Sequence, residues 1–160
     1  MVKNSKNLFI KFIFLVSIIA LVSAFFIEYI LGHQPCNLCI LERIPYFLAI
    51  IVVLLNYKFF QFEKFFILLL AIIFLAGTIL SLYHLGIEQG FIEESLVCDL
   101  KSGSNLLSKE EILKQLQEKS ISCKDVTFKI FGLSLTSYNI LISLLITIGA
   151  GKIYFNYDKN

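Results

Sequence analysis

One apolar stretch decides the class of this protein: Phe65 to Ile87 reads FFILLLAIIFLAGTILSLYHLGI and carries no formal charge apart from a possible one on His84. A helix needs about 20 predominantly apolar residues to cross the hydrocarbon core of a bilayer. The apolar residues form a continuous block instead of recurring along one helical face, as they would in a helix that covers a soluble core. This stretch therefore predicts a transmembrane helix.

Three other stretches have the same character, at about Leu8–Ile30, Ile40–Tyr57 and Ser137–Tyr157. The hydrophobic fraction of the chain is 58% and the mean hydropathy is +0.81, above the roughly 45–50% apolar usage of soluble domains. The net charge is only +2, so nothing indicates a nucleic-acid partner. We expect an all-α membrane protein with one domain, residues 1–160, folded as an antiparallel bundle of four transmembrane helices.

Basic residues predict the orientation, because lysine and arginine gather in short cytoplasmic segments. The loops at about 31–39 and 88–136 fall on one side of the membrane, and in the longer loop carboxylates outnumber lysines. We expect both termini in the cytoplasm and these two loops outside. The lysines on the other side are Lys3, Lys6, Lys11, Lys58, Lys64, Lys152 and Lys159.

A cleaved signal peptide is the competing interpretation of the first apolar stretch. Its basic start and the small residues from Val22 to Ala24 resemble such a peptide and its cleavage site. However, the apolar stretch is longer than is usual for a signal peptide, and three more predicted spans follow it. We expect an uncleaved anchor.

The long outer loop carries a helix signal of its own. Ser108 and Glu111 form a capping-box pattern, and Ile112, Leu113 and Leu116 follow at one-sided helical spacing. The pattern predicts a short amphipathic helix at about Lys109–Lys119. Its narrow apolar stripe suits the membrane surface or the side of the bundle.

The four cysteines all fall in or beside the two outer loops, at Cys36, Cys39, Cys98 and Cys123. Four cysteines allow three disulfide connectivities. Two of the cysteines lie close together in the sequence and the other two lie far apart. This spacing favours the disulfides Cys36–Cys39 and Cys98–Cys123. Their position on one face favours an oxidising compartment and disulfide chemistry.

Cys36-Asn-Leu-Cys39 is a CxxC motif, which is typical of dithiol redox centres. If the second helix begins near Leu38, Cys39 lies in its first turn, where free N–H groups favour a thiolate. Arg43 follows four residues later, so one continuous helix would bring its guanidinium towards the Cys39 sulfur. We expect the reactive anion at Cys39.

Other roles remain open for these residues. The CxxC can be half of a metal site completed by Cys98, Cys123, His33 or His84. The second cysteine pair is separated by 25 residues instead of forming a second knuckle, so no metal is expected. Both pairs can also be structural disulfides, Arg43 an ordinary interfacial residue, and His84 an interfacial or a functional histidine.

Three stretches carry a resemblance to one known family. Residues 34–46 (QPCNLCILERIPY) closely resemble the signature of the disulfide bond formation protein B (DsbB) family, which has a CxxC-x3-Arg motif leading into its second helix. Residues 83–89 (YHLGIEQ) and 131–135 (FGLSL) are also similar to that family. The resemblance covers nearly the whole chain, although the chain lacks tryptophan, which family members often carry.

The resemblance implies a bacterial inner-membrane enzyme, a protein-disulfide:quinone oxidoreductase. It would reoxidise a periplasmic thiol oxidase of the DsbA type and pass the electrons to ubiquinone or menaquinone. Cys98 would be attacked by the partner, Cys123 would exchange with Cys36, and Cys39 would face the quinone. Arg43 and His84 are the expected quinone-binding residues, and we expect a monomer.

Two other classes remain alternatives. One is a membrane thiol redox protein of the vitamin K epoxide reductase type, although the CxxC does not lie late in this bundle as it does in that family. The other is a non-enzymatic channel or assembly factor with structural disulfides. An ion path is expected to carry intramembrane charge, and none lies at the centre of a predicted span.

Overall fold

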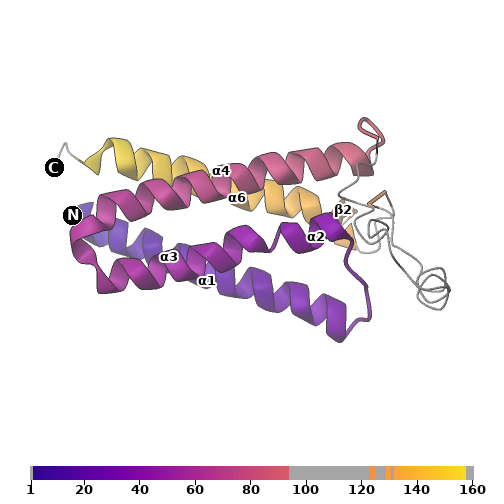
Figure 1. Cartoon of the computed structure of the whole chain (residues 1–160), viewed down its shortest axis with the longest axis horizontal. Helices are drawn as coiled ribbons and strands as arrows, with labels where there is room; N and C mark the ends of the chain where they lie inside the picture. Colours follow the sequence, from indigo (N-terminus) through magenta and orange to yellow (C-terminus); the bar gives the residue numbers. More distant parts are fainter. Residues whose placement is uncertain (1, 94–122, 125–128, 131, 158–160) are drawn as a thin grey trace, which may run out of the picture.

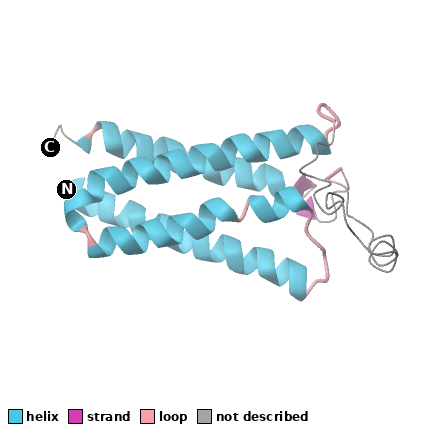
Figure 2. Cartoon of the chain, in the orientation of Figure 1, coloured by secondary structure: helices cyan, strands magenta, loops and turns pink. Residues whose placement is uncertain are grey.

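The structure, a computed structural model, describes residues 2–93, 123–124, 129–130 and 132–157 and arranges them as a bundle of long helices (Figure 1) (Figure 2). Four segments are long and apolar enough to cross a membrane, which confirms the predicted bundle of four transmembrane helices. The expected helix Lys109–Lys119 lies outside the described residues. The elements are α1 (Val2–Tyr29), α2 (Asn37–Leu41), α3 (Ile44–Lys58), the 3-10 helix η1 (Phe60–Phe62), α4 (Glu63–Glu88), β1 (Lys129–Ile130), β2 (Leu133–Ser134) and α6 (Leu135–Phe155).

Neighbouring helices run in opposite directions. The short turn η1 joins α3 to α4, so these two helices pack side by side, while α4 also packs along α6 and α1 packs against α3. As a result, α1 begins and α6 ends at the same end of the bundle (Figure 1). The loop between α1 and α2 and the start of α6 lie at the other end, which we call the cysteine end.

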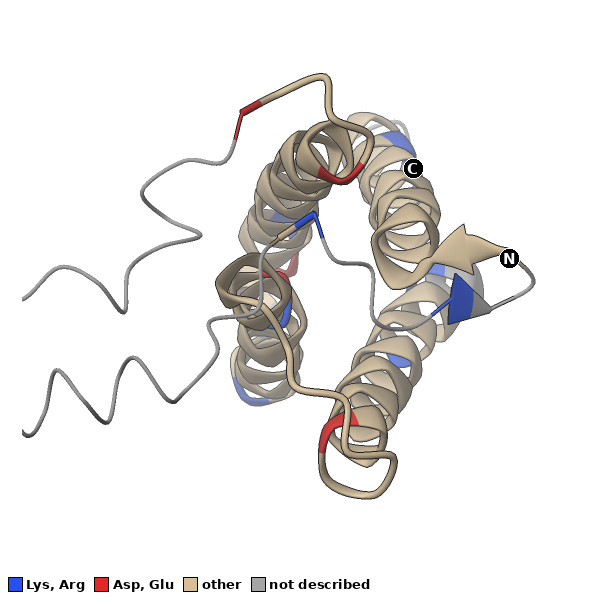
Figure 3. Ribbon diagram, turned by 90° about the vertical axis from the view of Figure 1, so that its right-hand side faces the viewer, with Lys and Arg blue, Asp and Glu red and all other residues tan. Residues whose placement is uncertain are grey.

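The half of the bundle away from the cysteines is held by an apolar cluster. Phe74 is fully buried there and meets Tyr46 edge to face, with ring centroids 5.6 Å apart. Large apolar side chains also cover the outside of every long helix, as expected for a bundle that faces lipid, and few charged residues interrupt them (Figure 3). The apolar cluster comprises Ile10, Ile13, Tyr46, Ala49, Val52, Val53, Phe66, Leu70, Phe74 and Ile146.

The second span is not one uninterrupted helix. It begins at Asn37, and α2 ends at Leu41 before α3 begins at Ile44. Pro45 explains the break, because it has no N–H to donate to the carbonyl of Leu41 and its ring would clash with that carbonyl. Gly77 of α4 accommodates the proline, since a Cβ added there would lie 3.1 Å from the Pro45 ring. Glu42 and Arg43, which lie between α2 and α3, therefore form a turn instead of continuing the helix.

The last transmembrane helix starts from a small antiparallel ladder. Strand β1 pairs with β2, with Lys129 opposite Ser134. Gly132 has a φ of 82° in the connection, a conformation that glycine adopts readily. Ser134 then caps α6, because its Oγ accepts a hydrogen bond from the Ser137 N–H at 3.4 Å. The ladder and cap hold the start of α6 beside the CxxC motif.

Candidate active site

The CxxC cysteines sit at the first turn of α2. Cys36 is the N-cap residue, and its sulfur accepts a hydrogen bond from the Cys39 N–H at 3.3 Å. Both cysteines are free, and their sulfur atoms lie 2.7 Å apart. The structure therefore represents the dithiol form of this pair, with the sulfurs already facing each other.

The thiolate was expected at Cys39, whereas in this dithiol the stabilising contacts converge on Cys36. A hydrogen bond from the Cys39 thiol, followed by the hydrogen bond and charge of His84, outweighs burial and lowers the pKa of Cys36 to about 5. The Cys39 N–H in the first turn of α2 also donates to the N-cap sulfur. These contacts favour the thiolate at Cys36, with Cys39 as its hydrogen-bonded partner.

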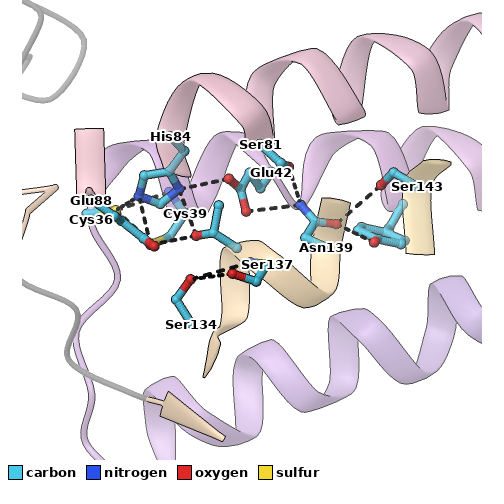
Figure 4. Close-up of polar contacts among 12 residues, drawn as sticks. Cys36, Cys39, Glu42, Ser81, His84, Glu88, Ser134, Ser137, Asn139 and Ser143 are labelled. Carbon is cyan, nitrogen blue, oxygen red and sulfur yellow. Dashed lines mark hydrogen bonds and ion pairs between the residues drawn. The ribbon is translucent and has the colours of Figure 1, made fainter. Parts of the chain in front are cut away.

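His84 lies beside the cysteines and connects them to Glu42 (Figure 4). Its side chain is 1% exposed, and its Nε2 lies 3.5 Å from the Cys36 sulfur. On the other side of the ring, Nδ1 is 2.8 Å from a Glu42 oxygen and 3.2 Å from the Thr136 hydroxyl. The order thiol, imidazole, carboxylate is an arrangement in which a base is oriented by a third group.

Two carboxylates flank the histidine. Glu42, from the turn after α2, is nearly buried and binds His84 through one oxygen. Glu88, one helical turn beyond His84 on α4, places one oxygen 3.8 Å from Nε2 and accepts a hydrogen bond from Thr136 at 2.7 Å. Its second oxygen is buried with no hydrogen-bond partner among the described residues. Burying a carboxylate is costly unless it is paired and hydrogen-bonded.

Asn139 of α6 extends the network towards the middle of the bundle. Its side-chain amide donates to the second Glu42 oxygen at 3.0 Å and to the Ser81 hydroxyl at 2.8 Å. Its carbonyl accepts hydrogen bonds from the hydroxyls of Tyr46 and Ser143. Because every polar atom of Asn139 is used, it fixes Glu42, and through Glu42 the ring of His84.

Arg43 does not follow the expected helical geometry. The break before Pro45 makes Arg43 the N-cap of α3 instead of a residue on the α2 face that carries Cys39. Its guanidinium is paired with Glu28 of α1 at 2.5 Å and lies over the ring of Phe25, 5.2 Å from the centroid. Arg43 therefore ties the start of α3 to the end of α1 at the border of the site.

A cavity of about 700 Å³ opens beside these residues. Near the start of the chain, Phe9 of α1 packs against Gly149 of α6, where an added Cβ would lie 2.6 Å from the ring. From there α1 diverges from the other helices towards the cysteine end (Figure 1). Apolar side chains of α1 and α6 form the walls. The polar lining residues include Cys36, Cys39, Glu42, Arg43, His84, Glu88, Thr136 and Asn139.

The outer cysteine pair is described only in part. Cys123 is 2% exposed and disulfide-bonded, and it belongs to one buried group with Cys36, Leu38 and Ile87. Cys98, its expected partner, lies outside the described residues. Among the described residues, the structure thus brings Cys36, Cys39, Cys123, Arg43 and His84 to one cavity.

Sequence reasoning missed the polar residues that support the cysteines, namely Glu42, Glu88, Thr136 and Asn139. Two of them carried a usable signal. Glu42 follows Cys39 by three residues within a predicted span, and Glu88 follows His84 by four, so both share a helical side with a site residue. Thr136 and Asn139 had no such signal, because only the tertiary fold brings α6 to this place.

Comparisons with known proteins show the family of the chain. Residues 6–152 match the family of disulfide bond formation protein DsbB. Uncharacterized protein RP370 of Rickettsia prowazekii (strain Madrid E) is 36% identical over 150 residues, which cover 91% of this chain and 85% of that protein. The family match over residues 6–152 includes the CxxC motif, His84 and most of α6. This multi-pass membrane chain belongs to the DsbB family, whose members are oxidoreductases of disulfide bond formation.

Proposed function

We propose that the protein reoxidises a periplasmic thiol oxidase of the DsbA type and passes the electrons to a membrane quinone. The observation that carries the proposal is the position of the reduced CxxC pair. It shares a cavity with disulfide-bonded Cys123 on one side and with apolar walls of α1 and α6 on the other. A pair in this place can take electrons from a soluble partner and deliver them to an acceptor dissolved in lipid.

The first half of the reaction is thiol–disulfide exchange. The partner's dithiol attacks the Cys98–Cys123 disulfide at Cys98, and the partner's second thiol resolves the mixed disulfide. The partner leaves oxidised, and Cys98 and Cys123 become thiols. Cys123 then attacks Cys36 of the oxidised CxxC and releases Cys39. Cys98 attacks Cys123 and releases Cys36, which re-forms the Cys98–Cys123 disulfide and leaves the electron pair on Cys36 and Cys39. The common packing of Cys36 and Cys123 supports this direct exchange.

The second half returns Cys36 and Cys39 to a disulfide and releases two electrons and two protons. One proton comes from the hydrogen-bonded Cys36–Cys39 pair, whose sulfurs lie 2.7 Å apart, and the other comes from His84, whose charge stabilises the thiolate. His84 Nε2 lies next in line at 3.5 Å, with Glu42 behind Nδ1. We assign Cys39 as the electron donor and His84 as the group that moves the proton away.

The cavity suits a quinone. Its volume lies within the roughly 300–1,000 Å³ of ligand pockets, and such pockets combine apolar walls with a few polar groups. Arg43, His84 and Cys39 would hold the ring at the polar end, and the apolar walls would accommodate the tail. A quinone supplies a two-electron acceptor more oxidising than a DsbA-type partner, which is itself a strong oxidant.

Quinone reduction by the purified protein tests the proposal. Reduced thiol oxidase is the electron donor, and a short-chain ubiquinone or menaquinone is the acceptor, followed by its absorbance. We expect turnover that needs the donor, the protein and the quinone together. Cys123→Ser should stop turnover, because no Cys98–Cys123 disulfide is left for the reduced donor to attack. Turnover with the thiol oxidase that survives in Cys123→Ser would contradict the relay.

We further propose that the protein lies in the bacterial inner membrane with both termini in the cytoplasm. The lysine distribution supports this, as does the position of the start of α1 and the end of α6 at one end of the bundle (Figure 1). Alkaline phosphatase fused after Asn105 should be active, and the same fusion after Gln61 should be inactive. The reverse pattern would put the cysteines in the cytoplasm and contradict the proposed reaction.

A further inference from the structure

The reduced site has the composition of a metal site as well as that of a redox pair. The sulfurs of Cys36 and Cys39 and a ring nitrogen of His84 lie within 4.8 Å of one another. Sequence spacing had indicated no metal, because the second cysteine pair is not a second knuckle. In the structure the third ligand comes instead from α4, which the spacing of cysteines does not predict.

Glu88 lies next to this group of three and offers a carboxylate as a fourth ligand. Its side chain is 6% exposed, and one carboxylate oxygen lies 3.8 Å from His84 Nε2. Thr136 binds that oxygen, while the other oxygen is buried without a partner among the described residues. A buried carboxylate oxygen that lacks a hydrogen bond carries a desolvation cost. A cation bound beside the thiolates would remove that cost.

The surroundings of His84 match those of a metal-bound histidine. A histidine that ligates a metal through one nitrogen almost always donates its other N–H to a carboxylate or carbonyl, which fixes the ring. Here Nδ1 faces Glu42 at 2.8 Å, so Nε2 is the nitrogen directed at the cysteines. Asn139 holds the second oxygen of Glu42 at 3.0 Å, which fixes the supporting carboxylate.

We propose that the dithiol form of this protein binds one Zn²⁺ through Cys36, Cys39, His84 and Glu88, and that the metal keeps the pair from being reoxidised. Two thiolates, an imidazole and a carboxylate suit tetrahedral zinc and exclude Mg²⁺ and Ca²⁺. With Zn–S bonds of about 2.3 Å, tetrahedral geometry separates the sulfurs by about 3.8 Å. The present separation is 2.7 Å, so a modest side-chain movement suffices.

Binding is a proton exchange and involves no redox step. Zn²⁺ displaces the remaining protons of the two thiols and any proton on Nε2, and each sulfur then shares its lone pair with the metal. Sulfurs held in this way cannot form the Cys36–Cys39 bond until the metal leaves. Oxidised protein has no thiolates to offer and is expected to remain metal-free. The inhibitory effect rests on the proposed function, whereas the binding does not.

Cobalt binding by the full-length protein in detergent tests the site directly. The protein is reduced, freed of reductant without oxygen, and titrated with Co²⁺, whose thiolate charge-transfer and tetrahedral d–d absorption report the ligands. We expect one equivalent to bind, to be displaced by Zn²⁺, and to be absent from the oxidised protein. Equal absorption in oxidised protein, or none in reduced protein, would overturn the proposal, and neither comparison needs a substitution.

Three variants assign the ligands. Cys36→Ser should abolish the charge-transfer absorption. Glu88→Gln, which changes a proposed ligand, and Glu42→Gln, which changes the carboxylate that orients His84, should each weaken binding by about 10–100-fold. Glu93→Gln, at an exposed carboxylate, is the matched control and should bind as the wild type does. Helical content by circular dichroism confirms folding, and unchanged affinity in Glu88→Gln would overturn the assigned fourth ligand.

The activity assay separates the two proposals. Under the proposed function, Zn²⁺ added to reduced protein should stop quinone reduction, and a chelator should restore it. Cobalt binding by a protein that does not reduce quinone would contradict the proposed function but support the metal site. Quinone reduction that proceeds at the same rate in zinc-loaded protein would overturn the inhibitory effect.

Discussion

At the end where the chain begins, α1, α3 and α4 meet through the aliphatic and aromatic side chains of the apolar cluster, whereas at the cysteine end the helices meet through hydrogen bonds. His84 and Glu42 are buried there and Asn139 is half-buried, and burying polar groups is costly unless they are hydrogen-bonded, as these are. Packing alone could have closed the bundle at both ends. The polar network at one end therefore indicates chemistry, and the cavity beside it gives that chemistry room.

The sharpest way to test this contrast is to remove one sulfur. Cys39→Ser leaves Cys36 without the partner with which it forms a disulfide, so we expect quinone reduction to fall on the order of 10³-fold or more, while the outer pair still exchanges with the thiol oxidase. Ser17→Ala, in the buried part of α1 away from the cysteines, is the control and should keep normal turnover. Normal turnover in Cys39→Ser would remove Cys39 as the electron donor.

The opposite outcome is expected in the apolar cluster. Phe74→Ala removes a fully buried ring that contacts Tyr46, and the cavity it leaves should cost about 3 kcal/mol of unfolding free energy. Unfolding by denaturing detergent would measure this cost. We expect the folded variant to retain most of its quinone reduction. A stable Phe74→Ala variant with lost activity would show that the two ends are not separate in function.

Sequence could predict much of the apolar half but less of the cysteine end. Apolar run lengths predict four spans, because each crossing needs a set number of residues in lipid. The sequence shows the CxxC motif and Arg43, and it predicts one continuous second helix. In the structure Pro45 interrupts that helix between α2 and α3. The partners of His84 come from three helices, and the free energy of that arrangement depends on distances which no local pattern contains.

The contact between His84 and Cys36 should be visible as a pH effect. The pKa of Cys36 is lowered to about 5, so alkylation of the reduced protein should be fast above that pH and lost below it as the thiolate is protonated. His84→Gln removes one stabilising partner, and we expect the midpoint to rise by about one unit, equivalent to about 1.4 kcal/mol. His33→Gln provides a histidine control. An unchanged midpoint in His84→Gln would contradict the assigned contact.

The smallest effect is expected at the border of the site, where Arg43 pairs with Glu28. Both side chains are partly exposed, so Arg43→Ala should cost quinone turnover about fivefold and raise the quinone KM. Arg43→Lys should cost less, because it keeps the charge but loses the planar fork. Glu28→Gln separates two roles. If Arg43 acts by holding α1, Glu28→Gln should match Arg43→Ala. If it acts on the quinone directly, Glu28→Gln should stay near wild type.

The divergence of α1 from the other helices has a consequence for how the rate must be measured. Phe12, Ile19 and Leu145 line the cavity and are also exposed on the outside of the bundle, where lipid lies. An acceptor that enters past them arrives from hydrocarbon, so the concentration that matters is its mole fraction in the membrane. Adding lipid that contains neither protein nor quinone should slow the reaction, because it lowers the mole fraction of quinone in the membrane. The amount of quinone per volume of solution stays the same.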